Sequence, residues 1–355
     1  MNARERVLTA LKRTGRPDKT PFEISWGAFT PLLMNTFREK TGSNLTPEEY
    51  FDFDTRFVLP SPTKQKTDFT KFYKNEPLPA NISINEWGIG SVPTLYEIPD
   101  FKYHPLEQMS TVEEIENYPW PDLGEDYRYI EVAEQTKVFQ DRGYAVCGEL
   151  YQTIFETAWL MRGMIPFLMD LILNEGIAHA ICENITRIRI KQARLFAKAG
   201  VDIIRLGDDI VSQQGLMMSR ETYNAFFKHR IQRIIQAAKE VNPDVIIFMH
   251  SCGRVEEVID DFIEAGVEVL NPLQPECNDL TAIFNKYKDK LSFWGGIGVQ
   301  SVMFSGTPEE VTFKVRETNG IFGKNGGFLM APAHILDPAI PWENVVAFID
   351  AAKNG

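Results

Sequence analysis

The stretch "VIIFMHSCGR" at residues 245–254 decides how the rest of the chain is interpreted. Its apolar run ends abruptly at His250, Ser251 and Cys252, so two good metal ligands stand two positions apart where a buried strand would emerge. Near-continuous apolar runs of this length are typical of strands in parallel sheets, because such strands are covered on both faces. The stretch therefore predicts a buried parallel strand with polar chemistry at its carboxyl end.

Further β-rich segments of this kind occur along the chain, and those after residue 140 alternate with helical patterns. They are "TPFEIS" near residue 20, "TRFVLP" near residue 55, "YAVCGEL", "VDIIRLGDD", "VEVLNPLQPE", "LSFWGGIG" and "GGFLMAPAH". The helical stretches include 219–241 and 307–323, and the second opens with Thr307 as N-cap and Pro308 in the first turn. Strands that alternate with helices imply right-handed crossovers and a parallel sheet.

Eight such units close a (β/α)8 TIM barrel, which is the α/β fold that we expect. An open doubly wound sheet is the alternative, but no GxGxxG turn follows the first strand. The N-terminal "MNARERVLTALKR" predicts an amphipathic helix, and the proline-rich segment at about 61–125 predicts an insertion with a hairpin at "NISINEWGIG". We expect one domain over residues 1–355.

Composition narrows the classes of function. Hydrophobic residues make up 44% of the chain and charged residues 24%, as in globular proteins. Lys and Arg total 37 against 49 Asp and Glu, so the net charge is 37 − 49 = −12 and nucleic acid is an unfavourable partner. No apolar run is long enough to span a membrane. Four cysteines without framework spacing indicate reduced thiols and a cytoplasmic protein.

Polar residues gather at the predicted strand ends, where barrel enzymes place their chemistry. They are Glu23, Ser25, Asp54, Arg56, Glu149, Asp208, Asp209, His250, Cys252, Gln274 and His334. Zinc needs three or four converging ligands, and His334 and Glu149 are the best candidates to join His250 and Cys252. The alternative is a buried cysteine beside a hydrogen-bonded histidine, with no metal.

Other strand-end residues are candidates for contacts with a substrate. Of the doublet Asp208 and Asp209, one acid is expected to point into the barrel mouth and the other to cap a helix or loop, and we assign the functional role to Asp208. Trp26 and Tyr151 would offer stacking walls to a flat substrate, although most barrel aromatics simply pack. Gln274 is a further substrate-binding candidate, or a residue that stabilises its own loop.

Four segments resemble the uroporphyrinogen decarboxylase superfamily, and the resemblance covers nearly the whole chain. They are "VDIIRLGDD", "HSCGRVEEVIDDFIEAGVEVLNPLQ", "FWGGI" and "APAHILDPAIPWENVVAFIDAA". The resemblance implies a (β/α) barrel and one of two activities, tetrapyrrole decarboxylation or zinc-dependent methyl transfer involving a corrinoid. The decarboxylases carry an arginine-rich RQAGR stretch after the first strand, whereas "FEISWGAFTP" contains no arginine. The methyltransferase branch is therefore favoured.

That branch carries an H-x-C motif and a later cysteine that together hold zinc. His250 and Cys252 match the motif, and His334 occupies the position of the later cysteine, counted back from the shared signature at 341–344. Glu149 replaces a residue that is usually proline, so it is placed to complete a set of four ligands. Imidazole is an equally good zinc ligand, but His334 is also compatible with a substrate-binding role without metal.

The resemblance implies a methyltransferase that moves a methyl group from a small methylated compound, such as a methoxyaromatic, to the cobalt of a corrinoid. Zinc would polarise the leaving oxygen, and Asp208 or Glu149 would donate a proton or orient the substrate. The alternatives are methyl transfer from methylcobalamin to a thiol, and a metal-free barrel that binds or decarboxylates a small acid. No histidine stands in the D-x-H-x-x-G pattern of cobalamin-binding modules, so the corrinoid is expected on a partner protein. The oligomeric state stays open, a homo-oligomer included.

Overall fold

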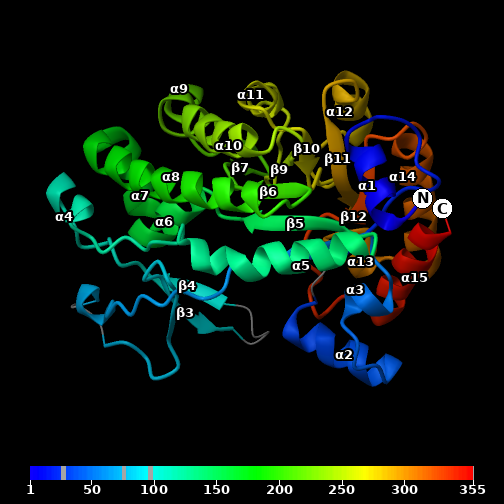
Figure 1. The fold of residues 1–355 in the computed structure, drawn as a ribbon, viewed down its shortest axis with the longest axis horizontal. Coiled ribbons are helices and arrows are strands. Elements are labelled where there is room, and N and C mark those ends of the chain that lie inside the picture. Colours follow the sequence, from blue (N-terminus) through cyan, green and yellow to red (C-terminus); the bar gives the residue numbers. More distant parts are fainter. Residues whose placement is uncertain (25–28, 74–76, 95–98, 355) are drawn as a thin grey trace.

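The computed structural model describes residues 1–24, 29–73, 77–94 and 99–354. At its centre lies a seven-stranded parallel sheet in the order β1-β5-β6-β9-β10-β11-β12 (Figure 1). Its strands are β1 (Thr55–Val58), β5 (Ala145–Leu150), β6 (Ile203–Gly207), β9 (Ile246–His250), β10 (Val269–Asn271), β11 (Ser292–Ile297) and β12 (Phe328–Pro332). Each strand lies where an apolar run predicts it.

The eighth position of the barrel is filled by the segment around Phe22. Phe22 forms a parallel bridge with Met330 of β12, and the Glu23 N–H donates to the Met330 carbonyl at 3.1 Å. On the other side, the Asp54 N–H donates to the Phe22 carbonyl at 3.2 Å, just before β1. The segment therefore joins β12 to β1, and the predicted TIM-barrel fold is confirmed with its first strand reduced to a bridge.

Helices connect successive strands and cover the outside of the sheet (Figure 1). The α-helices are α1 (Ala3–Leu11), α2 (Pro31–Thr41), α3 (Pro47–Tyr50), α4 (Val112–Glu116), α5 (Ile130–Asp141), α6 (Phe155–Arg162), α7 (Met164–Leu173), α8 (Glu175–Lys198), α9 (Arg220–Tyr223), α10 (His229–Val241), α11 (Ile259–Ala265), α12 (Leu280–Tyr287), α13 (Val302–Ser305), α14 (Pro308–Phe322) and α15 (Trp342–Lys353). Short 3-10 turns are η2 (Thr70–Phe72) and η3 (Asp126–Tyr129), and η4 (Asn224–Lys228) is a π-helical turn between α9 and α10.

Local sequence explains where the helix after β11 begins. The Thr307 side chain accepts from the Glu310 N–H, and the Glu310 carboxylate accepts from the Thr307 N–H at 2.7 Å, which makes a capping box. Pro308 occupies the first turn, where no intrahelical donor is needed. This is the helix start that the sequence predicts at 307.

The N-terminal helix closes one end of the barrel. Val7 and Leu11 of α1 pack into the cluster of side chains that fills the lumen, which includes Ile203, Ile246 and Val269. These lumen residues come from the first half of each strand. The opposite end, where the strands finish, is therefore the end that remains available for a site.

The segment predicted as an insertion forms its own small antiparallel sheet. Its strands are β2 (Ser83–Ile84), β3 (Gly90–Pro93) and β4 (Pro99–Tyr103), and β2 pairs with β3 as the predicted hairpin. A two-stranded ribbon, β7 (Val211–Ser212) with β8 (Gly215–Leu216), follows β6. Figure 1 places β3, β4 and α4 at one end of the molecule and α1, α14 and α15 at the opposite end.

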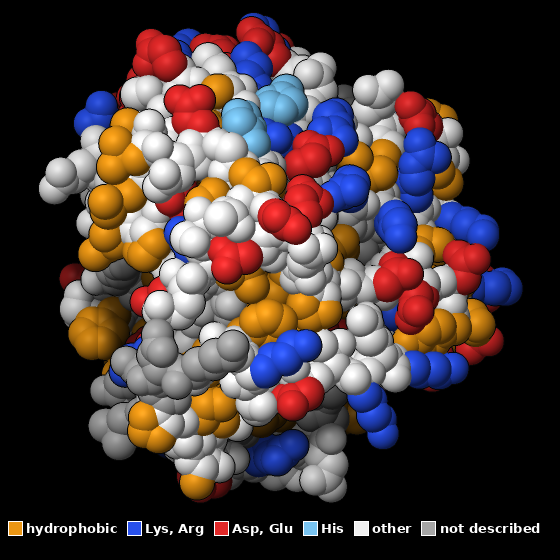
Figure 2. Space-filling view, turned by 90° about the vertical axis from the view of Figure 1, so that its left-hand side faces the viewer, with side chains coloured by type: hydrophobic (Ala, Val, Ile, Leu, Met, Phe, Trp, Pro, Cys, Tyr) orange, Lys and Arg blue, Asp and Glu red, His pale blue; other side chains and the backbone are white. Residues whose placement is uncertain are grey.

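The surface mixes charges of both signs. Figure 2 shows Lys and Arg side chains interspersed with Asp and Glu on the face that it presents, with hydrophobic side chains between them. Exposed apolar side chains include Ile165, Ile172 and Leu173 of α7. Among the described helices, none is long and apolar enough by itself to cross a membrane, and only α7 and α8 taken together, bent by 117°, meet that test.

Candidate active site

Three of the predicted ligands converge at the carboxyl end of the barrel. His250 is the last residue of β9, Cys252 follows it by two positions, and His334 follows the end of β12 by two. One ligand atom from each lies within 4.8 Å of the other two. Cys252 Sγ lies 3.3 Å from His250 Nε2. We call His250, Cys252 and His334 the ligand group.

Hydrogen bonds prepare His250 to act as a ligand. Asn271 Nδ2 donates to the Trp294 carbonyl at 2.8 Å, so Asn271 Oδ1 must be the atom that accepts from His250 Nδ1 at 2.5 Å. The proton of His250 is therefore on Nδ1, and the lone pair on Nε2 faces Cys252. Partners of this kind, which fix the tautomer of a histidine, are typical around metal ions.

The protonation states of the ligand group suit a cation. Burial lowers the pKa of His250 to about 4 and also lowers the pKa of His334, so both imidazoles are neutral at pH 7. Burial, with the Asp209 and Glu156 carboxylates nearby, raises the pKa of the Cys252 thiol. A divalent ion bound here would compensate that cost and hold the thiolate. Two imidazoles and a thiolate are a suitable donor set for zinc.

A constrained loop fixes the position of Cys252. Gly253 has φ +105°, and a Cβ at this position would lie 2.6 Å from the Ser212 carbonyl oxygen. The Arg254 N–H donates to the same carbonyl at 2.9 Å, and the Gly253 N–H donates to Gln274 Oε1 at 3.2 Å. The loop after β9 is thus held against the β7 ribbon and against the loop after β10.

The two acids after β6 lie in different surroundings: Asp208 faces the start of α6, and Asp209 lines the pocket. Asp208 is buried and accepts from the N–H groups of Ile154 and Glu156, at 2.8 and 3.1 Å, so it caps the start of α6. Asp209 lines the pocket beside the ligand group. Its Oδ1 accepts from the Cys252 N–H at 2.7 Å and lies 3.6 Å from His250 Nε2.

A second carboxyl group stands behind Asp209. Glu156 Oε2 accepts from the Asp209 N–H at 3.3 Å, and its side chain is buried. Burial, together with the charges of Asp209 and Asp208, raises the pKa of Glu156 to about 9. Glu156 therefore carries a proton at neutral pH. The sequence signal that points to Glu156 is weak, because it lies inside α6 and not at a strand end.

Glu149, predicted as a fourth ligand, lies outside the ligand group. It projects into the barrel lumen, where its Oε1 lies 3.1 Å from the Arg205 guanidinium of β6. Burial raises the pKa of Glu149, and the charge of Arg205 opposes that rise. The guanidinium lies 4.4 Å from the ring centroid of Phe248 and 5.3 Å from that of Trp294. The apolar run of β6 gives no sign of this ion pair, because its partner comes from another strand.

The other residues predicted to contact a substrate, Tyr151, Gln274 and Trp26, do not all lie in the pocket. The Tyr151 ring packs against His250 with 5.4 Å between ring centroids, and it fills the space that a side chain at Gly207 would take. Gln274 lines the pocket while its Oε1 holds the Gly253 N–H. Trp26 lies outside the described residues.

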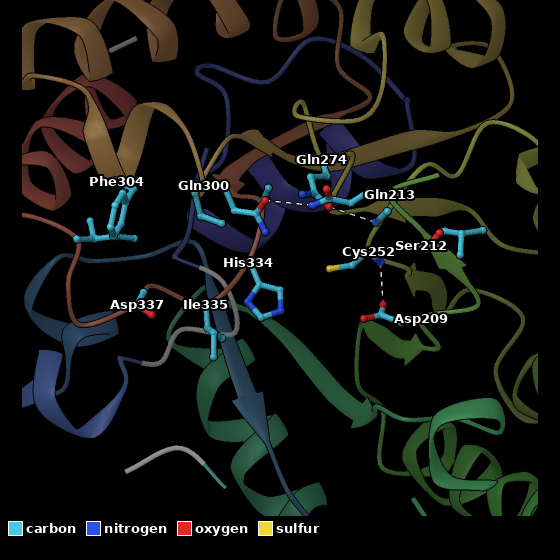
Figure 3. A pocket seen from close by; sticks show the side chains of 15 residues that line it. Asp209, Ser212, Gln213, Cys252, Gln274, Gln300, Phe304, His334, Ile335 and Asp337 are labelled. Carbon is cyan, nitrogen blue, oxygen red and sulfur yellow. Dashed lines mark hydrogen bonds between the residues drawn. The ribbon is translucent and has the colours of Figure 1, made fainter. Parts of the chain in front are cut away.

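A pocket of about 720 Å³ opens over the ligand group (Figure 3). Apolar and amide side chains line most of it, and Asp209 lines it beside Cys252 and His334 of the ligand group. The described residues that line it are Asp209, Val211, Ser212, Gln213, Cys252, Gly253, Gln274, Val299, Gln300, Phe304, Ala333, His334, Ile335, Asp337 and Ile340. Its volume suits a small molecule.

Known proteins share this fold and parts of this sequence. A "methyltransferase from Methanosarcina mazei" superposes with a TM-score of 0.69 at 16% identity, over 100% of this chain and 99% of that chain, which shows the same fold. A uroporphyrinogen decarboxylase of Christiangramia forsetii is 27% identical over 51% of this chain and 49% of its own length. A methylated-thiol–coenzyme M methyltransferase of Methanosarcina mazei is 27% identical over 50% of this chain and 44% of its own length.

The matches to these curated relatives span about half of their length, so they do not carry a whole activity over to this chain. The family model described as "Uroporphyrinogen decarboxylase (URO-D)" matches residues 88–355, which is well over half of the sequence. That match includes every described member of the ligand group and the strands that position them. The chain belongs to the uroporphyrinogen decarboxylase family.

Proposed function

We propose that this chain is a methyltransferase that takes a methyl group from a small methylated ether and transfers it to the cobalt of a corrinoid held by a partner protein. The observation that carries the proposal is the ligand group of His250, Cys252 and His334, which lies beside a pocket at the carboxyl end of the barrel. The similarity to a methylated-thiol–coenzyme M methyltransferase supports methyl transfer as the class of reaction.

The composition of the ligand group favours an ether as methyl donor. When bound, zinc would supply a Lewis acid that polarises the ether oxygen. Two neutral imidazoles and one thiolate would leave the site with a net positive charge, whereas each further thiolate would reduce its acidity. An acidic site stabilises a leaving alkoxide or phenoxide. A site that prepares a thiolate to attack methylcobalamin has less need of that charge.

The chain's own residues would orient the donor. The corrinoid is the acceptor substrate: the electron pair of its cobalt(I) would form the bond to the methyl carbon, giving cobalt(III), while the electrons of the carbon–oxygen bond would stay on oxygen. The leaving oxygen would take one proton from solvent. Asp209, on the pocket wall 3.6 Å from His250 Nε2, takes the place that we expected for Asp208 as the residue that orients the donor. Glu156, protonated behind it, would add no negative charge beside the ligand group.

Decarboxylation of a porphyrinogen is the less favoured activity. Such a substrate carries many carboxylates, and these need Arg or Lys partners. Among the described residues that line the pocket there is no Lys or Arg, whereas Asp209 and Asp337 are both present. The walls of the pocket would repel a polyanion.

Zinc analysis of two cysteine variants tests the proposal. Cys252→Ala should reduce bound zinc from about one equivalent to less than a tenth, because one of three protein ligands is lost. Cys277→Ala is the matched control, since Cys277 is a partly buried loop thiol outside the ligand group, and it should keep its zinc. His334→Cys should also retain zinc, because thiolate replaces imidazole. Full zinc occupancy in Cys252→Ala would exclude the proposed site.

Activity is measured separately with a visible spectrum of cobalt(I) cobalamin, the zinc-loaded protein and a panel of methyl donors. Methylation of cobalt changes the corrinoid absorption directly. We expect a methoxyaromatic donor to give methylcobalamin with the unaltered chain and none with Cys252→Ala. Methylcobalamin consumption by a thiol, without any reaction from ethers, would instead favour transfer in the opposite direction.

A further inference from the structure

The charge of the pocket indicates which donors it accepts. Its carboxylates are those of Asp209 and Asp337. Its other polar side chains are those of Ser212, Gln213, Cys252, Gln274, Gln300 and His334. Lys and Arg are absent from the lining in the part of the chain that the structure describes.

The end of the pocket away from the ligand group carries the Asp337 carboxylate, with no Lys or Arg among the described residues that line it. That end of the pocket is therefore negative. An anionic donor would meet repulsion that the low polarity of a half-enclosed pocket would strengthen, and a cationic donor would be attracted.

The negative charge is divided between two ends of the pocket. In Figure 3, Asp209 and Cys252 lie on one side, Asp337 and Phe304 lie on the other, and His334 lies between them. Asp337 is half-buried, and its Oδ1 accepts from the Ala339 N–H at 2.8 Å. A carboxylate in this position can accept another hydrogen bond, from a bound molecule at the end of the pocket that lies away from His250, Cys252 and His334.

Apolar side chains connect the two ends. Val299, Phe304, Ile335 and Ile340 line the pocket, and Figure 3 places Ile335 beside His334, between Asp337 and Asp209. A flat ring would pack against such walls, with one substituent near His334 and the opposite substituent near Asp337. This arrangement selects a ligand by shape and by the charge of its far end.

We infer that the methyl donor is a methoxyaromatic amine, whose ammonium group is held at Asp337 while its methoxy group lies at the ligand group. The inference rests on the proposed function, because it assumes that the ligand group faces the reacting methyl. Asp337 is then a specificity-determining residue that contacts the substrate without taking part in bond breaking. Carboxylated methoxyaromatics are poor ligands for the same reason.

Equilibrium binding to the zinc-loaded chain, without corrinoid, tests the inference. The probes are para-methoxyphenethylamine, para-methoxyphenylethanol and para-methoxyphenylpropionate, which share a ring and differ in end-group charge. We expect the amine to bind at least about 10-fold more tightly than the propionate, as for opposite charges in a partly enclosed site. Asp337→Asn should reduce that ratio to below about 3-fold, because the amide keeps the Ala339 hydrogen bond but loses the charge.

The matched control is Asp350→Asn, which removes the same charge from an exposed position on α15 and should leave the ratio unchanged. Equal affinities for amine and propionate, tighter binding of the propionate, or no measurable binding of the amine would overturn the inference. An unchanged ratio in Asp337→Asn would overturn the assignment of Asp337. Methyl transfer from the three probes to cobalamin is measured separately. If the amine binds selectively but none of the three probes donates its methyl group, the result contradicts the proposed function and leaves the binding inference intact.

Discussion

Two residues that are adjacent in the sequence can lie in different surroundings at the site. Asp208 and Asp209 are adjacent, yet one caps α6 and the other faces the ligand group. Successive side chains at a strand end point in opposite directions, and the frame of that alternation depends on register with the next strand. The doublet could therefore be predicted to split, but which acid faces the pocket could not.

Asn271 shows how a residue without ligand chemistry controls one that has it. Asn271→Leu removes the acceptor for His250 Nδ1–H and the donor to the Trp294 carbonyl at nearly unchanged volume. We expect zinc affinity to fall by about 10- to 100-fold, because the tautomer and ring orientation of His250 are no longer fixed. Competition with a chromophoric chelator measures the affinity.

The control for this change is Asn278→Leu, since Asn278 also holds a loop near the site, through the Gly253 and Gln274 carbonyls, but touches no member of the ligand group by its side chain. Its effect on zinc affinity should be several-fold smaller. If Asn271→Leu bound zinc as tightly as the unaltered chain, the hydrogen bond to His250 would have no part in metal binding.

At the scale of elements, the strands are the most predictable part of the molecule. Buried parallel strands appear in the sequence as β-rich, mostly apolar segments, and every strand of the central sheet lies within one of the segments predicted. The first strand is shorter than the pattern suggests, because Phe22 makes only a bridge. Ion pairs between strands, such as Arg205 with Glu149, are invisible to the pattern since they depend on which residues become neighbours across the sheet.

The start of α6 has a pH-dependent contribution to stability. Burial raises the pKa of Asp208 from 3.8 to about 7, so the folded protein holds this proton more tightly than the unfolded chain. The resulting stabilisation is present below pH about 4 and is lost as the pH rises to about 7. We expect the free energy of unfolding of the metal-free protein to fall by about 2–4 kcal/mol over that range on account of Asp208.

Urea unfolding at pH 5 and pH 8, with a chelator present, measures this contribution. Asp208→Asn should be less stable than the unaltered chain at pH 5, because the amide accepts fewer of the α6 N–H groups, and the gap should narrow or reverse at pH 8. A constant difference between the two proteins at both pH values would show that Asp208 does not titrate in this window.

The loop that carries Cys252 depends on glycine. Gly253→Ala places a Cβ 2.6 Å from the Ser212 carbonyl at φ +105°, so the loop must move. We expect bound zinc to fall at least about 5-fold, while the free energy of unfolding falls by only about 1–3 kcal/mol. Gly320→Ala in α14 is the control, because nothing lies within 4 Å of the new Cβ, and it should keep its zinc with slightly higher stability. Normal zinc content in Gly253→Ala would refute the constraint.

At the scale of the whole molecule, the barrel explains why distant segments meet. His250 and His334 are far apart in sequence, yet both follow strands that end on one rim, and that topology is what allows a pairing to be predicted from strand ends alone. The pocket is less predictable, since its outer end combines Phe304 of α13 with Asp337 of the last loop. Neither position is part of a strand, so the alternation of strands and helices says nothing about them.

Under the proposed function, a corrinoid protein would dock over the same rim, because methyl transfer requires the cobalt to approach the donor's methyl group in line and nearly in contact. Phe313 of α14 is 67% exposed and lies beside α13, next to the rim but outside the substrate pocket. Phe313→Glu should slow methyl transfer to the protein-bound corrinoid by at least about 10-fold, and transfer to free cobalamin by less than about 2-fold, since exposed aromatics often anchor interfaces.

Ile172→Glu makes the same change at an equally exposed position on α7, on another side of the barrel, and should affect neither acceptor (Figure 1). Rates with both acceptors, measured at saturating methyl donor, separate docking from chemistry. If the partner docks over this rim, methyl transfer should be slow only when Phe313→Glu is combined with the protein-bound corrinoid. Equal losses with both acceptors would place the defect in the pocket, and a loss confined to Ile172→Glu would move the docking surface to α7.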